Sequence, residues 1–415
     1  MSPVANCVIV GASLAGASAA AELREQGYEG RILLIGEEAE RPYERPPLSK
    51  EHLRGEASRD KVFVHPEGFY DDHGIELLLG SRVTDIDRAA SRVIVGDGER
   101  AIPFDRLLIA TGATPRRLHL PGGELEGIHY LRRLADSDRL AWALRGAGRL
   151  VVVGGGWIGA EVAASARQLG VEVVLVEQTS TPLERVLGHE VGALWADIHR
   201  GHGVQLVTSS SVAGFEGSGT VERVRLAGGR TVECDLVAVG VGVIPNAELA
   251  ALAGLHVDDG IVVDSELRTE DPRIFAAGDV ASAWHPLYDA SLRVEHWANA
   301  KNQGVAAARS MLGLGEPYER VPYFFSDQYD VGMEYSGLAP DWDRVVLRGD
   351  PSSGEFIAFW LEGDRVLAGM NVNVWDVVEP IQELVRSRAP VGAERLADIT
   401  VPLTDLAAEA AEGAR

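Results

Sequence analysis

The chain has 415 residues, of which 46% are hydrophobic and 24% are charged, a composition typical of a globular protein with two or three domains. Its formal net charge of -23 argues against nucleic acid and anionic membranes as partners, because a polyanion would be repelled by most of the surface. No apolar run approaches the length of a membrane span, and the first expected strand lies too close to Met1 for a secretory signal. We therefore expect a cytoplasmic protein.

The chain contains two cysteines, Cys7 and Cys234, and each lies inside an expected strand. Two isolated thiols exclude a disulfide framework, a Cys-x-x-Cys redox pair and a cysteine metal site. We expect no bound metal. Any redox chemistry must then come from a bound cofactor.

A dinucleotide-binding pattern of strand, glycine turn, helix, strand and acid occupies the first forty residues. Gly11 permits the tight turn, and Gly16 lets the following helix lie close to the first strand. That helix offers unpaired N–H groups and a partial positive charge to a pyrophosphate. Ser13 replaces the central glycine of the fingerprint. Glu37 ends the second strand, where a carboxylate accepts hydrogen bonds from ribose hydroxyls.

A proline-rich loop with charged residues follows and includes Arg45 and Lys50. Two interpretations are equally supported: a surface connection, or a rigid loop that holds these two cations against the cofactor. The apolar run 107–113 then predicts another buried parallel strand that ends in a glycine turn. Residues 114–127, rich in proline and glycine, are typical of a domain junction.

The opening pattern is repeated at residues 150–177, this time with all three fingerprint glycines, Gly154, Gly156 and Gly159. One turn holding FAD and the other a nicotinamide would supply a complete path for a hydride. Glu177 ends the second strand of this copy, where a carboxylate pairs with a free 2′-hydroxyl and repels a 2′-phosphate. NADH is therefore favoured. A third buried strand from Leu236 closes the copy.

The chain then returns to the first domain with a short apolar strand that delivers Asp279 at a glycine. A helix is expected to begin near Glu295, and its N-terminal N–H groups could stabilise negative charge on a reduced flavin. From about Tyr318 the pattern predicts a small α+β domain without a nucleotide signature, for which a lid or a dimerisation element is the favoured interpretation. Residues 405–415 are expected to form a frayed, alanine-rich tail.

These pieces resemble the FAD-dependent, NADH-linked ferredoxin reductases that serve bacterial oxygenases and cytochromes P450. The likeness covers essentially the whole chain. It implies an α/β fold with two dinucleotide-binding, Rossmann-like domains of the glutathione-reductase type and a small C-terminal α+β domain. The implied limits are 1–113 and 247–318 for a discontinuous FAD domain, 114–246 for the NAD domain and 319–415 for the C-terminal domain. The motifs that carry the likeness are the turn GASLAG, 45–50, 110–113, 154–161, 242–246, 274–279 and 324–329.

The resemblance also implies roles for individual residues. Lys50 and Glu161 would form an ion pair near flavin N5, Trp297 would lie by the isoalloxazine, and Asp279 would bind the ribityl or pyrophosphate end. Trp157 would cover the flavin until the nicotinamide displaces it, and Arg185 would reach the NADH adenosine. The implied FAD residues are Gly11, Ser13, Leu14, Ala15, Gly16, Glu37, Arg45, Lys50, Val83, Ala110, Thr111, Gly112, Arg132, Asp279, Glu295 and Trp297. The implied NAD residues are Gly154, Gly156, Trp157, Ile158, Gly159, Glu161, Glu177, Arg185 and Gly242.

The implied activity is hydride transfer from NADH to FAD, followed by single-electron transfer to a [2Fe-2S] ferredoxin that supplies a cytochrome P450 or a Rieske-type oxygenase. The protein would be a monomer or a homodimer. An NADH oxidase or disulfide reductase of the same superfamily is an alternative, although no redox cysteine occurs between Pro42 and Lys50. A redox-responsive interaction protein resembling apoptosis-inducing factor is a second alternative.

Two departures from the family pattern affect these expectations. Some relatives carry tryptophan where this chain has Phe325, so a role for an indole at that position does not transfer. The chain is also strongly acidic, as ferredoxins usually are, so docking would need a local basic patch. The candidate cations for that patch are Arg54, Arg59, Lys61, Arg386 and Arg388, although a solvated surface charge is the favoured interpretation of each.

Overall fold

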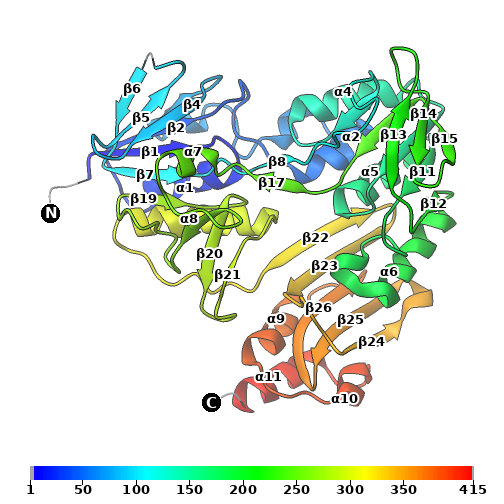
Figure 1. Cartoon of the computed structure of the whole chain (residues 1–415). Coiled ribbons are helices and arrows are strands. Elements are labelled where there is room, and N and C mark those ends of the chain that lie inside the picture. Colours follow the sequence, from blue (N-terminus) through cyan, green and yellow to red (C-terminus); the bar gives the residue numbers. More distant parts are fainter. Residues whose placement is uncertain (1–3, 99, 414–415) are drawn as a thin grey trace. The chain divides into compact units, whose positions relative to one another are not determined.

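The structure is a computed structural model that describes residues 4–98 and 100–413. The chain divides into two compact units, and each consists of segments that are distant in the sequence (Figure 1). The first unit contains Met1–Glu44, Arg59–Thr114 and Val243–Pro322. The second contains Arg45–Ser58, Pro115–Gly242 and Tyr323–Arg415. Within the described ranges, no helix is both long enough and apolar enough to cross a membrane.

A parallel five-stranded sheet, in the order β19-β7-β1-β2-β3, forms the centre of the first unit. Its strands are nearly continuous apolar runs because both faces are covered. Helices α1 and α8 lie side by side on one face, and the antiparallel sheet β4-β5-β6 lies on the other (Figure 1). The elements of the first unit, including β8 at its boundary, are β1 (Asn6–Val10), α1 (Leu14–Glu25), β2 (Arg31–Ile35), η2 (Arg59–Val62), α3 (Phe69–Asp72), β3 (Ile75–Leu78), β4 (Val83–Asp87), β5 (Arg92–Val95), β6 (Arg100–Pro103), β7 (Arg106–Ile109), β8 (Ala113–Pro115), β17 (Val243–Pro245), α7 (Glu248–Leu252), β18 (Ile261–Val263), β19 (Ile274–Ala276), β20 (Ala281–His285), β21 (Ala290–Leu292) and α8 (Trp297–Met311).

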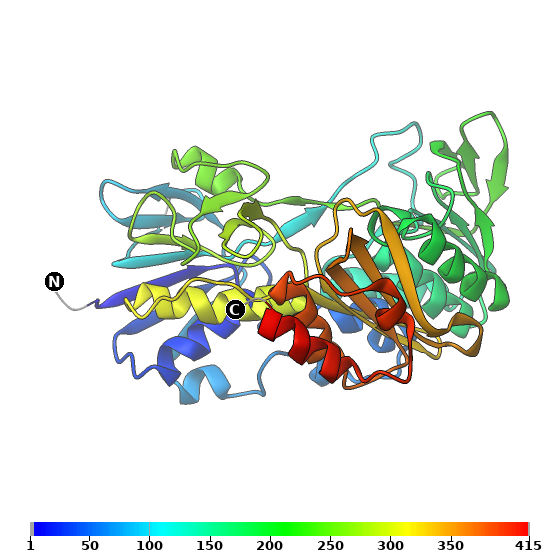
Figure 2. The same ribbon diagram turned by 90° about the horizontal axis from the view of Figure 1, so that it is seen from below.

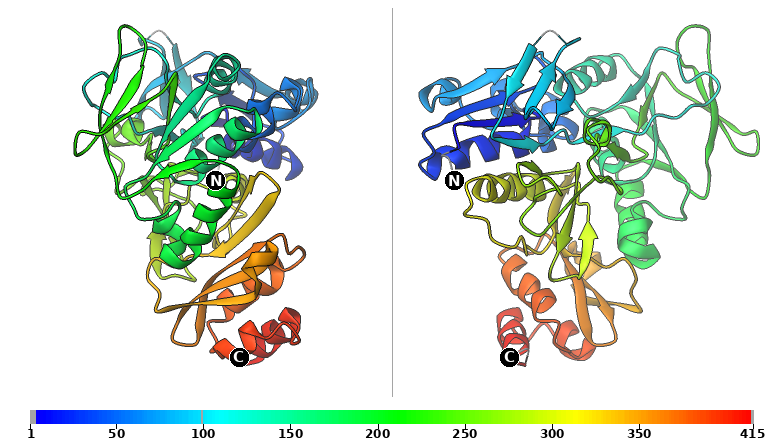
Figure 3. Two further views of the ribbon diagram at one scale, coloured as in Figure 1. Left: turned by 90° about the vertical axis from the view of Figure 1, so that its right-hand side faces the viewer. Right: turned by 60° about the vertical axis from the view of Figure 1, so that its left-hand side comes forward.

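The second unit contains a parallel sheet in the order β12-β11-β10-β16-β9 and an antiparallel C-terminal sheet in the order β22-β23-β26-β25-β24. Helix α6 packs on one face of the C-terminal sheet and α9 on the other (Figure 3). The last three helices, α9 to α11, run from orange to red in Figure 2. The elements are η1 (Pro46–Ser49), α2 (Glu51–Arg54), β9 (Ile128–Tyr130), α4 (Leu134–Leu144), β10 (Arg149–Val153), α5 (Trp157–Gln168), β11 (Glu172–Val176), α6 (Glu184–Gly201), β12 (Gln205–Val207), β13 (Val212–Glu216), β14 (Arg223–Leu226), β15 (Thr231–Glu233), β16 (Leu236–Val239), β22 (Tyr323–Gln328), β23 (Val331–Gly337), β24 (Arg344–Asp350), η3 (Pro351–Ser353), β25 (Glu355–Glu362), β26 (Arg365–Val372), α9 (Val378–Ser387), α10 (Ala393–Ala397) and α11 (Leu403–Gly413).

The segment Arg45–Ser58 packs in the second unit, whereas the sequence-based limits placed it in the FAD domain. Leu53 of α2 belongs to the same buried cluster as Leu140 of α4 and Val162 of α5. The Ser137 hydroxyl also donates to the Leu48 carbonyl at 2.7 Å. Packing and a buried hydrogen bond therefore fix this loop to the elements around the second glycine turn. The division into three domains stays a prediction.

The expectation of a frayed C-terminal tail is wrong for the described residues up to Gly413, because α11 is a packed helix. Leu403, Leu406, Ala407 and Ala410 are buried, and their spacing of three and four residues places them on one helix face. That face packs against α9. The sequence pattern did not indicate this buried face because two of its four residues are alanines, whose small side chains add little to hydrophobic periodicity.

Candidate cofactor and active sites

The first glycine turn lies in the first unit between β1 and α1. Gly11 has a φ of +119°, and a Cβ there would lie 2.1 Å from the Ala110 carbonyl oxygen, so only glycine fits. A Cβ on Gly16 would lie 2.0 Å from the Gly11 carbonyl oxygen, which shows how closely the helix approaches the turn. Ser13 caps the helix with extended backbone and no side-chain cap, and the first turn of α1 carries no acid. This helix start is suited to a pyrophosphate.

Asp279 follows Gly278, which lies beside that turn. Gly278 has a φ of +78°, and a Cβ there would lie 3.2 Å from the Ala15 Cβ. Gly278 donates its N–H to Gln303 of α8 at 2.9 Å, which fixes the Asp279 backbone, and the Asp279 side chain is mostly buried. A dinucleotide phosphate, backbone donors and one acid can therefore meet in this unit. These residues fit FAD.

Other predicted FAD residues of the first unit surround the same sheet. Glu37 follows β2 and is exposed, with Arg82 3.8 Å from its carboxylate, and Val83 is buried at the start of β4. The Thr111 hydroxyl donates to the Asn246 carbonyl at 2.8 Å, and Gly112 accepts from the Asn246 N–H at 2.9 Å. These two hydrogen bonds hold the glycine turn after β7 in place. Leu14 and Ala110, two further predicted FAD residues, are buried.

The N-terminus of α8 carries Trp297, next to Glu295, which pairs with Arg293. Lys301 lies over the Trp297 ring at 5.2 Å. The sequence analysis missed Glu44, which the structure brings to the same place. Burial raises the pKa of Glu44, and a hydrogen bond from Trp297 and the charge of Lys301 oppose that shift. A proline-rich segment gave no sequence signal for this contact.

Three predicted FAD residues, Arg45, Lys50 and Arg132, lie in the second unit. Arg45 donates to the Arg132 carbonyl at 2.5 Å, so the proline-rich loop is tied to the chain just before α4. Of the two interpretations, a surface connection or a rigid loop, the second agrees with this tethered geometry. Whether it faces the flavin stays a prediction.

The second glycine turn has the same geometry as the first, with a more open outer edge. Gly154 has a φ of +98°, and a Cβ on Gly159 would lie 2.0 Å from the Gly154 carbonyl oxygen. Gly156 caps α5 without a side chain, and a Cβ there would meet nothing within 4 Å. A ligand phosphate could approach the backbone at this position.

Glu177 is already engaged in hydrogen bonds before any ligand is considered. Its Oε2 accepts the Gly155 N–H at 2.5 Å, and its Oε1 accepts the Thr179 N–H at 2.9 Å and the Thr179 hydroxyl at 3.1 Å. The carboxylate therefore holds the shape of the turn as well as ending β11. Sequence reasoning missed Gly155, although its place in the run of three glycines was a signal for it.

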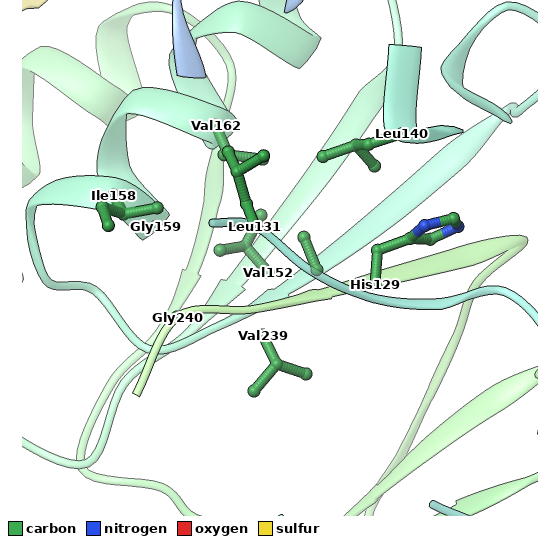
Figure 4. A pocket seen from close by; sticks show the side chains of 10 residues that line it. His129, Leu131, Leu140, Val152, Ile158, Gly159, Val162, Val239 and Gly240 are labelled. Atoms are coloured by element: carbon green, nitrogen blue, oxygen red, sulfur yellow. The ribbon is translucent and has the colours of Figure 1, made fainter. Parts of the chain in front are cut away.

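The remaining predicted NAD residues lie around this turn. Ile158 is partly exposed on the first turn of α5, Arg185 is exposed on the first turn of α6, and Gly242 follows β16 with a φ of +94°. A small apolar pocket lies between α4, α5 and the ends of β10 and β16, where the strand order reverses (Figure 4). Crevices at such switch points are the usual nucleotide sites of α/β sheets. The residues lining the pocket are His129, Leu131, Leu140, Val152, Ile158, Gly159, Val162, Ala238, Val239 and Gly240.

Lys50 and Glu161 form the predicted ion pair, with 3.0 Å between Nζ and Oε1 and only 7% of each side chain exposed. The other donors to this carboxylate were missed by the sequence analysis. The Ser49 hydroxyl donates to Oε2 at 2.5 Å and the Ser326 hydroxyl to Oε1 at 2.7 Å. Lys50 also donates to the Pro46 carbonyl at 3.2 Å. Both serines lie within the motifs 45–50 and 324–329, but no periodicity links them to Glu161.

A chain of hydrogen bonds extends from Ser326 along the same face of β22. Gln328 donates to the Ser326 hydroxyl at 3.2 Å, and its Oε1 lies 2.9 Å from Nε2 of buried His199. Nδ1 of His199 lies 3.1 Å from the Tyr329 hydroxyl. Burial lowers the pKa of His199 to about 4, so this imidazole is neutral at pH 7.

Trp157 packs in an aromatic cluster of the second unit. Its ring lies 6.0 Å from that of Trp195 and 5.0 Å from that of Phe324, both edge to face. Phe325 points to the other face of β22, where the Lys50 ammonium lies 5.7 Å from its ring centroid. The proposed covering of the flavin by Trp157 stays a prediction.

Residues 5–304 match the pyridine nucleotide-disulphide oxidoreductase family. The chain belongs to this family. Residues 323–407 match a second family, described as the reductase C-terminal family, so nearly every element of the chain lies in one of the two matches.

Relatives within the oxidoreductase family match the chain over nearly its whole length. It is 40% identical to putidaredoxin reductase CamA of Pseudomonas putida over 98% of this chain and 97% of the relative. It is also 40% identical to the ferredoxin–NAD(+) reductase component of the biphenyl dioxygenase system of Paraburkholderia xenovorans, over 96% and 97%. The reductase in the crystal structure of the covalent putidaredoxin reductase–putidaredoxin complex superimposes with a TM-score of 0.94 at 40% identity, covering 98% of this chain and 99% of that one.

These matches confirm the predicted resemblance, the fold class and the assignment as an FAD- and NAD-dependent oxidoreductase of ferredoxin-linked systems. They do not test individual site residues, whose roles stay predictions. The thiols offer no alternative chemistry, because burial raises the pKa of Cys7 to about 11 and that of Cys234 to about 12. A thiolate nucleophile of a disulfide reductase needs the opposite shift.

Proposed function

We propose that this chain is an NADH:ferredoxin reductase that supplies electrons, through a [2Fe-2S] ferredoxin, to a cytochrome P450 or a Rieske-type oxygenase. The observation that carries the proposal is the pair of glycine turns, each with an acid-free helix N-terminus, in a chain 40% identical to putidaredoxin reductase over 98% of its length. When bound, FAD would accept a hydride and release electrons singly. The first turn would hold FAD and the second NADH.

The work of Lys50 and Glu161 in this proposal is positioning. The Glu161 carboxylate accepts two hydroxyl hydrogen bonds and pairs with the Lys50 ammonium, so these contacts hold it in one orientation. The ion pair in turn fixes the Lys50 ammonium. A cation held in this way orients the reacting groups without transferring a proton itself.

Glu177 would select NADH over NADPH in the proposed reaction. Oε2 accepts one hydrogen bond, from Gly155, and keeps a second lone pair, so the carboxylate can accept from a ribose hydroxyl while it holds Gly155 and Thr179. A 2′-phosphate at the same place would meet a negative charge with no arginine directly after it in the sequence. The proposed three-domain limits and the roles of the other predicted residues belong to the same proposal.

A cytoplasmic location is also part of the proposal. Both cysteines are free and buried in the described structure, which suits a reducing compartment. Detecting the protein in the soluble cytoplasmic fraction of its own host would support this, and recovery from an extracellular or periplasmic fraction would contradict it.

An anaerobic mixing experiment tests the function directly. The purified FAD-loaded protein is mixed with NADH, a panel of oxidised [2Fe-2S] ferredoxins is added, and the absorbance of flavin and iron–sulfur centre is followed. Rapid loss of flavin absorbance followed by ferredoxin reduction is the expected result. Flavin absorbance that returns only after oxygen is admitted would contradict the proposal and favour an oxidase or a redox-responsive interaction protein.

A further inference from the structure

Helix α6 is interrupted at Gly188, close to the dinucleotide turn. Gly188 has a φ of 76° and a ψ of 171°, so the helix has one short turn up to Leu187 and then starts again. The break frees the Leu187 carbonyl, which accepts a hydrogen bond at 3.1 Å from the indole N–H of Trp360, a fully buried residue of β25. A Cβ on Gly188 would lie 2.6 Å from the Trp342 ring. Trp360 and Trp342 of the C-terminal region therefore both contact α6 at the break.

The two faces of β25 make different contacts. Trp360 lies in one buried cluster with Leu183, Leu187 and Val191, the inner residues of α6. Phe359, its neighbour in sequence, points the other way and lies near Gly369, beside Ile381 of α9. The indole of Trp360 therefore supports α6, whereas Phe359 supports only the C-terminal region itself.

The short first turn of α6 is linked to the glycine turn by hydrogen bonds. Leu183 has a φ of 60°, and its N–H donates to the Gly155 carbonyl at 2.9 Å. The Gly155 N–H donates to Glu177 at 2.5 Å, and a Cβ on Gly155 would lie 3.3 Å from the Pro182 Cα. Gly155 is thus held on one side by the acid and on the other by the segment that Trp360 anchors.

We propose that Trp360 is a positioning residue for the dinucleotide, and that the C-terminal region determines how tightly NADH binds. By holding Leu187 at the helix break, Trp360 fixes residues 182–187, and through Leu183 this segment fixes the Gly155 backbone. Arg185, exposed on the same short turn, is fixed with it. The inference rests on the proposed binding of NADH at the second glycine turn and deepens it, because it assigns a role to a region that carries no nucleotide signature.

The test measures the affinity of the full-length FAD-loaded protein for ADP-ribose, which has the adenosine and pyrophosphate of NADH but no nicotinamide. Isothermal titration would compare the wild type with Trp360→Phe, which keeps an aromatic ring and loses the N–H. The loss of one buried hydrogen bond predicts a dissociation constant about five- to tenfold higher. The KM for NADH should rise similarly, while kcat at saturating NADH stays within about twofold.

Two further variants separate positioning from general damage. Gly188→Ala places a methyl group against Trp342 at a backbone conformation that alanine rarely adopts, so it should weaken ADP-ribose binding as Trp360→Phe does. Phe359→Leu is the matched control: it perturbs the same strand on the opposite face, and it should lower the melting temperature while leaving the dissociation constant unchanged. If Trp360→Phe does not fold, Gly188→Ala carries the test.

The possible outcomes distinguish this inference from the proposed function. Unchanged ADP-ribose affinity in both Trp360→Phe and Gly188→Ala would overturn the inference, as would an equal loss in Phe359→Leu or a wild type that does not bind ADP-ribose. A wild type that binds ADP-ribose but reduces no ferredoxin would overturn the proposed function. The positioning role of Trp360 would then still stand on the variant affinities.

Discussion

Glu177 performs two tasks with one carboxylate, and a substitution can separate them. Replacement by glutamine removes the negative charge and keeps one oxygen acceptor, which can serve the Gly155 N–H or the Thr179 N–H but not both. We expect Glu177→Gln to reduce the preference for NADH over NADPH by about tenfold, since repulsion of the 2′-phosphate is relieved. The kcat/KM values for both nucleotides, measured with an artificial electron acceptor, test this.

The control for Glu177→Gln is Glu172→Gln at the other end of the same strand. Glu172 begins β11 and pairs with Arg149 at 2.7 Å in an exposed position. Glu172→Gln removes one negative charge, as Glu177→Gln does, and it should leave the preference for NADH over NADPH unchanged. Equal preference in wild type and Glu177→Gln would place the selectivity elsewhere in the protein.

Removing the Ser326 hydroxyl tests how much one hydrogen bond to the buried Glu161 carboxylate contributes. In Ser326→Ala, Glu161 keeps Lys50 and Ser49 but loses a donor at 2.7 Å. The lost hydrogen bond contributes about 1 kcal/mol to holding the carboxylate in place, and we expect the barrier to hydride transfer to rise by a similar amount. Flavin reduction by NADH should then be roughly three- to tenfold slower, with little change in NADH affinity. Stopped-flow mixing measures both quantities. Ser336→Ala, which removes a buried hydroxyl from the neighbouring strand β23, should reduce at the wild-type rate.

At the scale of elements, the close packing of α5 against its turn makes two glycines behave differently. A Cβ on Gly159 would lie 2.0 Å from a backbone oxygen, whereas one on Gly156 would meet nothing within 4 Å. We expect Gly159→Ala to destabilise the second unit by several °C in melting temperature. Gly156→Ala should keep the wild-type melting temperature and raise the KM for NADH about tenfold, because its methyl group occupies the place of the phosphate.

Circular dichroism melts and NADH titrations of the two glycine variants distinguish these expectations. If Gly156→Ala retained the wild-type KM, the pyrophosphate would not lie on the start of α5. If instead Gly159→Ala melted like the wild type, the helix would have shifted to accommodate the methyl group.

His199 connects α6 to β22 and predicts how stability depends on pH. Its pKa in the folded state is about 4, below the value of about 6.5 in an unfolded chain, so the unfolded state binds more protons between these pH values. The contribution of neutral His199 to the free energy of unfolding is therefore fully present above the unfolded pKa of about 6.5, and it is lost as the pH falls from there toward 4. The loss attributable to His199 is about 2 kcal/mol at pH 5.

The variant His199→Gln tests this pH dependence without changing the surface. Unfolding in urea at pH 7.5 and pH 5.0 should show a smaller difference in the free energy of unfolding for the variant than for the wild type. The difference that remains in the variant includes the contribution of His296, because burial also lowers the pKa of this residue to about 4. An equal difference in both proteins would contradict the assignment of His199.

The elements around both turns could be predicted from sequence because each depends on local spacing. Strand, glycines, helix and acid follow one another within about thirty residues, and the structure places Gly11, Gly154 and Glu177 in the predicted geometry. The pairing of Ser326 with Glu161 spans 165 residues, and the contact of Trp360 with Leu187 spans 173. No pattern in the sequence reports such contacts, because each serine or tryptophan fits its own strand equally well without them.

At the scale of the whole molecule, charge governs the encounter with a ferredoxin. The candidate docking cations are largely neutralised: Arg54 pairs with Glu56 at 2.6 Å and Arg59 with Glu40 at 2.8 Å. Arg386 likewise pairs with Glu383. A local basic patch built from these residues is therefore weaker than a count of arginines suggests. The net charge of -23 then dominates at long range.

Reduction of an acidic [2Fe-2S] ferredoxin should consequently become faster as salt is added. The Debye length is about 30 Å at 10 mM ionic strength and about 8 Å at 150 mM, so added salt screens the repulsion between the two acidic proteins. We expect kcat/KM for ferredoxin to rise roughly two- to fivefold over this range. An uncharged quinone is the control acceptor, because salt screening does not change its encounter with the protein, and the NADH dependence is measured in parallel to exclude an effect on the donor. A steady fall in kcat/KM for ferredoxin would show instead that attraction at a local basic patch outweighs the net charge, and charge-reversal variants of Lys61 and Arg388 would then locate that patch.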